Sequence, residues 1–171
     1  MSRIAALLAA LFATAAAHAA PVSLDDGSMT IDVPDGFAQL TDAERTKMFT
    51  RGNPPDFAFA SPGRDITIAV TFSSGSQTPE GLDLLKVQME QVLEAQPDVE
   101  FIEREMIQAN GQRWVHFEFT SEPAEGPAHN DIYLTSFRGR MLALSFNAQR
   151  TVHEANAQAL EASFRSIRLN P

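Results

Sequence analysis

The chain contains no cysteine. Disulfides, thiolate catalysis and cysteine-based metal or redox sites are therefore excluded, and a domain of this size must depend on its hydrophobic core. No glycine-rich run precedes either long helical pattern, which argues against a phosphate-binding loop and nucleotide chemistry. A Gly-x-Ser-x-Gly motif is also missing, so the serines of residues 73–76 fit a polar turn better than a nucleophile elbow.

Basic residues are scarce. The chain has 13 Lys and Arg against 22 Asp and Glu, a formal charge of −9. An acidic surface repels nucleic acids and anionic lipid headgroups, so we expect neither as a partner. A cationic partner and simple solubility both remain compatible with this charge.

Long hydrophobic runs are confined to the N-terminus. Residues 1–19, MSRIAALLAALFATAAAHA, carry one charge at Arg3, an apolar run from Ile4 to Ala17 and an Ala-His-Ala ending. This pattern predicts a cleaved secretory signal peptide, because the run is shorter than the roughly 20 residues of a membrane span. No cysteine follows for lipid attachment. We expect a periplasmic or secreted protein, not inserted in a membrane after cleavage, with residues 20–171 as a single domain.

The central pattern of the chain is a strand followed by a long helix. In residues 65–74, DITIAVTFSS, alternate apolar residues predict a strand packed most tightly on one face. In residues 77–96, Thr78 and Pro79 suit a helix start. The apolar stripe of this helix consists of Leu82, Leu85, Met89, Val92 and Leu93.

Short alternating runs surround this pair. Before it we expect strands over 28–33, 37–40 and 56–61 and a short helix over 41–49, with Thr41 or Asp42 as its N-cap. After it we expect a hairpin of 99–109 with 112–121 around Asn110-Gly111, a second hairpin of 131–137 with 140–147, and a helix over 151–167. Several strands are apolar on both faces. The sequence therefore predicts an α+β protein: an α/β/α sandwich with a mostly antiparallel sheet of about six or more strands and helices on both faces.

Four segments carry a family resemblance: IDVPDGF at 31–37, DITIAVTFSS at 65–74, YLTSFRGRMLALSF at 133–146 and ASFRSIRL at 162–169. With the layout of the chain, they resemble the PsbP-like family, which includes Mog- and DcrB-type proteins. The resemblance implies an α/β/α sandwich over nearly the whole of residues 20–171 and a role in binding another protein without catalysis. The predicted signal peptide departs from the cytosolic chaperone branch of that family.

One strand face carries the only candidate metal ligands. Counting outward from Asn110-Gly111, Glu105 faces His116 and Glu103 faces Glu118. His116, Glu118 and Glu103 are therefore weak candidates for a divalent-ion site, since imidazole and carboxylate suit zinc or manganese. The alternative is a solvated strand face with cross-strand polar pairs.

Four residues are candidates for contact with a protein partner. Trp114 lies either on an exposed face or packed beneath a helix. His129 belongs to a polar loop at the end of the sheet. Arg138 and Arg140 either form a local positive patch or take part in dispersed ion pairs.

These features favour an exported, non-enzymatic binding or accessory protein that recognises another envelope or secreted protein, in an accessory, chaperone-like or immunity role. We expect no catalytic residue and no cofactor, and the sequence carries no signal for the oligomeric state. Two alternatives are a small periplasmic metal-dependent hydrolase built on the candidate metal ligands, and a small-ligand or lipid carrier with its ligand between sheet and helix.

Overall fold

A computed structural model describes residues 20–50, 52–123 and 126–170. The predicted signal peptide lies outside the described residues. The centre is a seven-stranded sheet of order β3-β4-β5-β9-β8-β7-β6, in which every neighbouring pair is antiparallel. Its strands are β3 (Ala38–Gln39), β4 (Phe57–Ala60), β5 (Ile66–Ser76), β6 (Glu100–Ala109), β7 (Gln112–Ser121), β8 (Ala128–Phe137) and β9 (Arg140–Gln149). The predicted α+β class and antiparallel sheet are confirmed.

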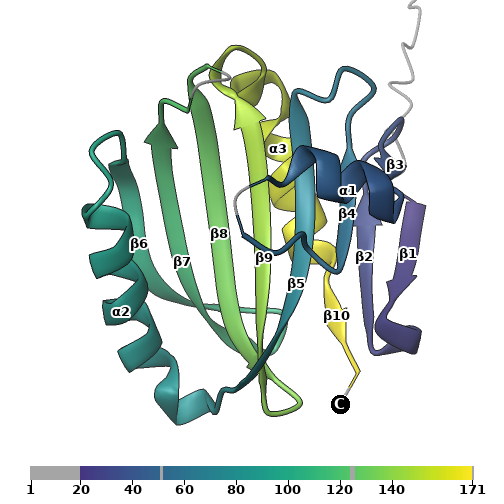
Figure 1. Cartoon of the computed structure of the whole chain (residues 1–171). Coiled ribbons are helices and arrows are strands. Elements are labelled where there is room, and N and C mark those ends of the chain that lie inside the picture. Colours follow the sequence, from purple (N-terminus) through teal and green to yellow (C-terminus); the bar gives the residue numbers. More distant parts are fainter. Residues whose placement is uncertain (1–19, 51, 124–125, 171) are drawn as a thin grey trace, which may run out of the picture.

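Helix α2 (Leu82–Glu94) covers one face of the sheet (Figure 1). Leu82 and Leu93 are buried against Val115, Phe117 and Phe119, with Leu85 and Met89 packed beside them. Val92, predicted in the buried stripe, is instead 56% exposed. Val92 lies on the solvent side of the helix, next to the exposed Gln91. Adjacent helical residues point about 100° apart, and Leu93 is the one that points into the sheet. Thr78 makes no side-chain cap, and the helix is preceded by a 3-10 turn, Pro79–Gly81.

The opposite face is covered by α3 (Arg150–Ser166) and by a second sheet, which the sequence does not predict. This sheet has the order β1-β2-β10, with β1 (Ala20–Leu24), β2 (Met29–Val33) and β10 (Arg168–Leu169). Figure 1 shows α3 behind the central sheet, with β2 and β1 beside it. Two residues of β10 carry no periodic pattern, and they become a strand only because they meet Met29 and Thr30 across the fold. Helices lie on both faces of the central sheet as predicted, and the small second sheet is an addition to that prediction.

Helix α1 (Asp42–Met48) begins with the capping box that the sequence predicts. The Thr41 hydroxyl accepts a hydrogen bond from the backbone N–H of Glu44, and the Glu44 carboxylate accepts one from the backbone N–H of Thr41. A small apolar cluster that includes Leu40, Met48 and Ala58 holds this end of the chain against β4 and β5.

The Asn110-Gly111 hairpin has the predicted register, with Glu105 opposite His116 and Glu103 opposite Glu118. Both turn residues have positive φ, 54° and 71°. The β8–β9 hairpin turns at Arg138-Gly139 as predicted, but β8 begins at Ala128, three residues before the predicted Asp131. His129 therefore belongs to a strand and not to a loop. Within the described residues, no helix has both the length and the apolar character of a membrane span.

Candidate functional site

A cluster of polar side chains lies on the sheet face beneath α3. Strand alternation places His116 and Glu118 of β7 on this face, and antiparallel pairing sets Tyr133 opposite His116 and Asp131 opposite Glu118. His129, two residues before Asp131, shares the face. Together with Glu103 of β6 and His153 of α3, these side chains form what we call the histidine–carboxylate cluster: Glu103, His116, Glu118, His129, Asp131 and His153.

Asp131 lies between two histidines of the cluster. Its Oδ1 is 3.2 Å from His116 Nε2, and its Oδ2 is 3.7 Å from His129 Nε2. Glu118 reaches the same nitrogen, with Oε1 2.9 Å from His129 Nε2. The carboxylates of β7 and β8 thus converge on His129.

The metal candidates predicted from the sequence are divided between two groups. Glu103 approaches His116, with Oε2 3.8 Å from Nδ1, while Glu118 faces His129 instead. Two triads each bring one ligand atom per residue to within 4.8 Å of one another: Glu103, Glu105 and His116, and His129, Asp131 and His153. The predicted pairing of Glu103 with Glu118 across the strands is correct, but their side chains turn to different histidines.

Aromatic stacking orders the cluster. The rings of His129 and His153 lie 3.4 Å apart between centroids at an interplanar angle of 15°. His116 stacks on Tyr133 at 4.4 Å, and Tyr133 stacks in turn on Phe164 of α3 at 3.7 Å. Stacking links both histidines of the sheet to α3, directly for His129 and through Tyr133 for His116.

Burial changes the ionisation of the cluster. It raises the pKa of Glu118, and the neighbouring carboxylates of Asp131 and Glu103 raise this pKa further. It lowers the pKa of His129, helped by His153 and Arg150 and opposed by Asp131. Burial also raises the pKa of the Tyr133 phenol, and the charge of Asp131 raises it further. The neutral imidazole of His129, the form that binds metals, is therefore favoured.

His129 Nε2 is buried without a hydrogen bond, even though Glu118 Oε1 lies 2.9 Å away. The two atoms are close but not aligned as a hydrogen bond requires, so the nitrogen has no hydrogen-bond partner among the described residues. A cavity of about 380 Å³ beside the cluster is lined by His116, Asp131, His153 and residues of α3. The cluster therefore has access to solvent along α3.

Two of the residues proposed for partner contact, Trp114 and His129, are buried. Trp114 is 0% exposed, and its ring meets Phe164 beneath α3, the alternative that the sequence left open. His129 is 7% exposed. Neither residue offers a surface to a partner, because each is needed to fill space between the sheet and α3.

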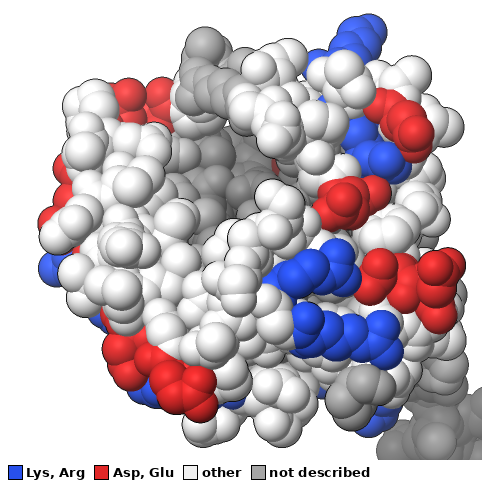
Figure 2. Space-filling model, turned by 60° about the horizontal axis from the view of Figure 1, so that its bottom comes forward, with Lys and Arg blue, Asp and Glu red and all other residues white. Residues whose placement is uncertain are grey.

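Arg138 and Arg140 lie near the β8–β9 turn. Arg138 donates to the Asn170 carbonyl and lies over Phe137, whereas Arg140 lies 3.4 Å from Asp25 and over Phe72. Figure 2 shows blue and red side chains next to one another on this end of the molecule. Dispersed ion pairs thus describe this surface better than one positive patch.

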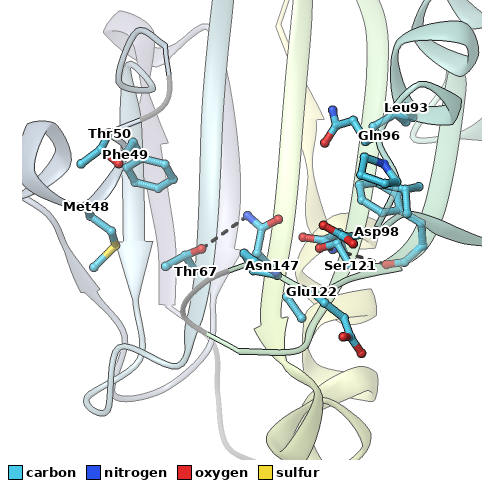
Figure 3. A pocket seen from close by; sticks show the side chains of 16 residues that line it. Met48, Phe49, Thr50, Thr67, Leu93, Gln96, Asp98, Ser121, Glu122 and Asn147 are labelled. Carbon is cyan, nitrogen blue, oxygen red and sulfur yellow. Dashed lines mark hydrogen bonds between the residues drawn. The ribbon is translucent and has the colours of Figure 1, made fainter.

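A groove of about 760 Å³ opens on the other sheet face, between α1 and α2. Its walls come from distant parts of the chain, and Figure 3 shows the α1 side, with Phe49, across the sheet from Leu93 and Gln96 on the α2 side. Asn147 and Thr67 lie on its floor, joined by a hydrogen bond of 3.4 Å from Asn147 Nδ2. Figure 2 shows a hollow bordered largely by uncharged side chains.

Sequence reasoning missed two members of the histidine–carboxylate cluster. The sequence predicts His153 only as part of the helix over 151–167, but α3 lies across the sheet and brings it onto His129. Asp131 is predicted as the first residue of the strand over 131–137, beside the polar loop of His129. If the predicted strand had begun before His129, it would have placed His129 and Asp131 on the same face as Tyr133. The three residues are spaced two apart, and every second residue of a strand points to the same face.

Comparison with solved structures defines the fold. Cyanobacterial PsbP (CyanoP) from Synechocystis sp. PCC 6803 aligns with a TM-score of 0.64 at 17% identity, over 95% of this chain and 98% of that one. LpqN of Mycobacterium tuberculosis, described as involved in cell envelope biogenesis, aligns with a TM-score of 0.62 at 14% identity, over 89% of this chain and 90% of that one. The Ran-binding protein Mog1p of Saccharomyces cerevisiae aligns with a TM-score of 0.54 at 14% identity, over 90% of this chain and 96% of that one.

The chain therefore has a PsbP/Mog1-type fold, as the sequence resemblance implies. No protein-family model matches it, and no curated protein sequence matches it. At identities this low the likeness concerns the fold, and function must be argued from the surfaces of this chain.

Proposed function

We propose that the protein is an exported, non-enzymatic binding protein of the bacterial envelope that holds a segment of another protein in the groove between α1 and α2. The groove itself carries this proposal, because it leaves part of one sheet face uncovered by either helix. Export is supported by the signal-peptide pattern of residues 1–19.

The lining of the groove suits a peptide. Phe49, Leu93 and Phe119 supply apolar surface, while Asn147 and Thr67 supply amide and hydroxyl groups. Such a mixture of apolar surface and hydrogen-bonding groups is typical of binding sites. Two carboxylates, Asp98 and Glu122, line the groove as well, so the bound segment should be neutral or positively charged.

The same lining disfavours catalysis in the groove. Among the described residues that line it, there is no histidine, lysine or arginine. A hydrolase built there would lack the histidine that most often activates a serine or threonine nucleophile.

The test is site-specific photo-crosslinking in cells that make the whole chain. A photoreactive amino acid at Gln96 or Glu122, both exposed on the groove, should yield one discrete crosslinked protein. The same probe at Asp35, which is exposed and does not line the groove, is the control.

A second substitution fills the groove. Asn147→Trp should abolish the crosslinks at Gln96 and Glu122 while leaving the melting transition within a few degrees of wild type. Crosslinks that are as strong from Asp35, or that persist in the filled groove, would contradict the proposal.

A small-ligand carrier is the second candidate, because 760 Å³ lies in the range of small-molecule sites, roughly 300–1,000 Å³. Native mass spectrometry of the protein purified from envelopes separates the two. A retained mass of a few hundred daltons would favour the carrier, and a protein crosslink without such a mass would favour peptide binding.

A further inference from the structure

The histidine–carboxylate cluster brings several carboxylates close together on the sheet face beneath α3. Glu103, Glu118 and Asp131 are three carboxylates, and the cluster contains no lysine or arginine. Glu118 and Asp131 have side chains only 23% and 17% exposed. Carboxylates this close repel one another unless a cation lies between them.

His129 provides a separate indication of a missing partner. Its side chain is only 9% exposed, and its Nε2 points among carboxylates without a hydrogen bond. A buried nitrogen left in this state destabilises the folded protein, which favours any group that satisfies it.

We propose that His129, Asp131, His153 and Glu118 bind a divalent transition-metal ion of the zinc type. The site joins β7 and β8 to the first turns of α3, and its four protein ligands define a closed, structural centre rather than a catalytic one. This inference is independent of the groove.

The distances fit such an ion. Bonds of about 2.0–2.1 Å in a tetrahedral site place neighbouring ligand atoms about 3.3 Å apart. His129 Nε2 lies 2.9 Å from Glu118 Oε1 and 3.7 Å from Asp131 Oδ2, one distance on each side of that value.

His153 completes the set from the helix. Its ring is stacked on His129, so it must turn out of the stack to direct a nitrogen at the ion. The residue is half-buried and lines the 380 Å³ cavity, which gives the ring room to turn and the ion a path of entry.

His116 supports one of the proposed ligands. Its Nε2 lies 3.2 Å from Asp131 Oδ1, whereas the other carboxylate oxygen, Oδ2, is the one near His129. A hydrogen-bonding neighbour of this kind orients a metal-binding carboxylate and strengthens the site. His116 is thus a positioning residue for Asp131.

The experiment uses the purified protein without a histidine tag, stripped of metal, and titrates it with Zn²⁺ by calorimetry. We expect one ion per chain and a rise in the melting temperature of about 5–10 °C when free Zn²⁺ is ~100 times the dissociation constant. His153→Gln should weaken binding at least ~10-fold, a loss that changes around metal sites commonly produce. Because His153 is half-buried, this variant should fold even if His129→Gln does not.

Glu105→Gln is the matched control. Glu105 belongs to the neighbouring triad with Glu103 and His116. The Zn²⁺ affinity of the Glu105→Gln variant should therefore stay within about twofold of wild type. A Zn²⁺ affinity lost in Glu105→Gln but kept in His153→Gln would place the ion in the other triad and overturn the proposal. Absence of heat and of thermal shift at millimolar Zn²⁺ would overturn it too.

Discussion

Trp114 of β7 and Phe164 of α3 meet edge to face, with ring centroids 5.4 Å apart at an interplanar angle of 79°. The indole Nε1 also donates to the Ala109 carbonyl at 3.0 Å, so the polar atom of this buried ring is satisfied. The single tryptophan of the chain thereby joins the central sheet to the closing helix.

This contact should dominate the stability of the α3 side. Trp114→Ala leaves a large cavity at a fully buried position and should lower the free energy of unfolding by about 3–5 kcal/mol, measured by urea denaturation. Val92→Ala, at a position 56% exposed, should change it by less than about 0.5 kcal/mol. Equal effects of the two substitutions would show that the tryptophan does not pack as described.

Two threonines that look alike in the sequence should differ in their effect on stability. Thr41 precedes α1 and accepts a hydrogen bond from Glu44 N–H, whereas Thr78 precedes Pro79 and makes no side-chain cap. Thr41→Ala should destabilise the protein by about 1 kcal/mol, the usual effect of losing an N-cap. Thr78→Ala, the control, should have less than about half that effect in the same denaturation series.

The capping box also predicts a pH dependence. Hydrogen bonds from the Thr41 backbone N–H and hydroxyl, with the charge of Arg64, lower the pKa of Glu44 from 4.5 to about 2. A carboxyl with a lowered folded-state pKa stabilises the protein fully above its unfolded value, and that stabilisation is lost as the pH falls from 4.5 toward 2.

Glu44→Gln should therefore reduce the dependence of the free energy of unfolding on pH across this window. The measurement is thermal melting at a series of pH values, and Glu80→Gln, at another exposed glutamate, should follow the wild-type curve. A slope unchanged by Glu44→Gln would exclude this carboxylate from the acid response.

Gly111 in the turn of the β6–β7 hairpin has a φ of 71°, in the left-handed region. No other atom lies near the position that a Cβ would occupy. Gly111→Ala therefore introduces backbone strain without a steric clash and should cost about 1–2 kcal/mol. Gly75 also has open space but no positive φ, so Gly75→Ala should be neutral or stabilising by up to about 1 kcal/mol. Denaturation of both variants measures the difference, and equal losses would point to steric crowding instead.

Local chemistry made several parts of the chain predictable. Asn110-Gly111 fixed the β6–β7 register because both residues tolerate positive φ, so the Glu103–Glu118 pairing could be counted from the turn alone. The start of α1 was predictable as well, with Thr41 as one of two possible N-caps, because a helix cap is a contact between neighbouring residues.

The candidate site was harder to predict because its members meet across the fold. Glu103 and His116 are adjacent through the predicted hairpin, and that pair was found. His153 joins His129 only when α3 packs on the sheet, and a helix pattern does not reveal which strand lies beneath each turn.

The sequence by itself determined the succession of strands and helices from β2 to α3, the antiparallel hairpins and the α+β class, because these follow from residue periodicity and turn chemistry within short segments. Only the tertiary structure decided which residues meet: β10 pairing with β2, Trp114 buried beneath α3, and three histidines gathered among carboxylates. Those contacts depend on how whole elements cross one another in space, and no local pattern of side chains encodes that geometry.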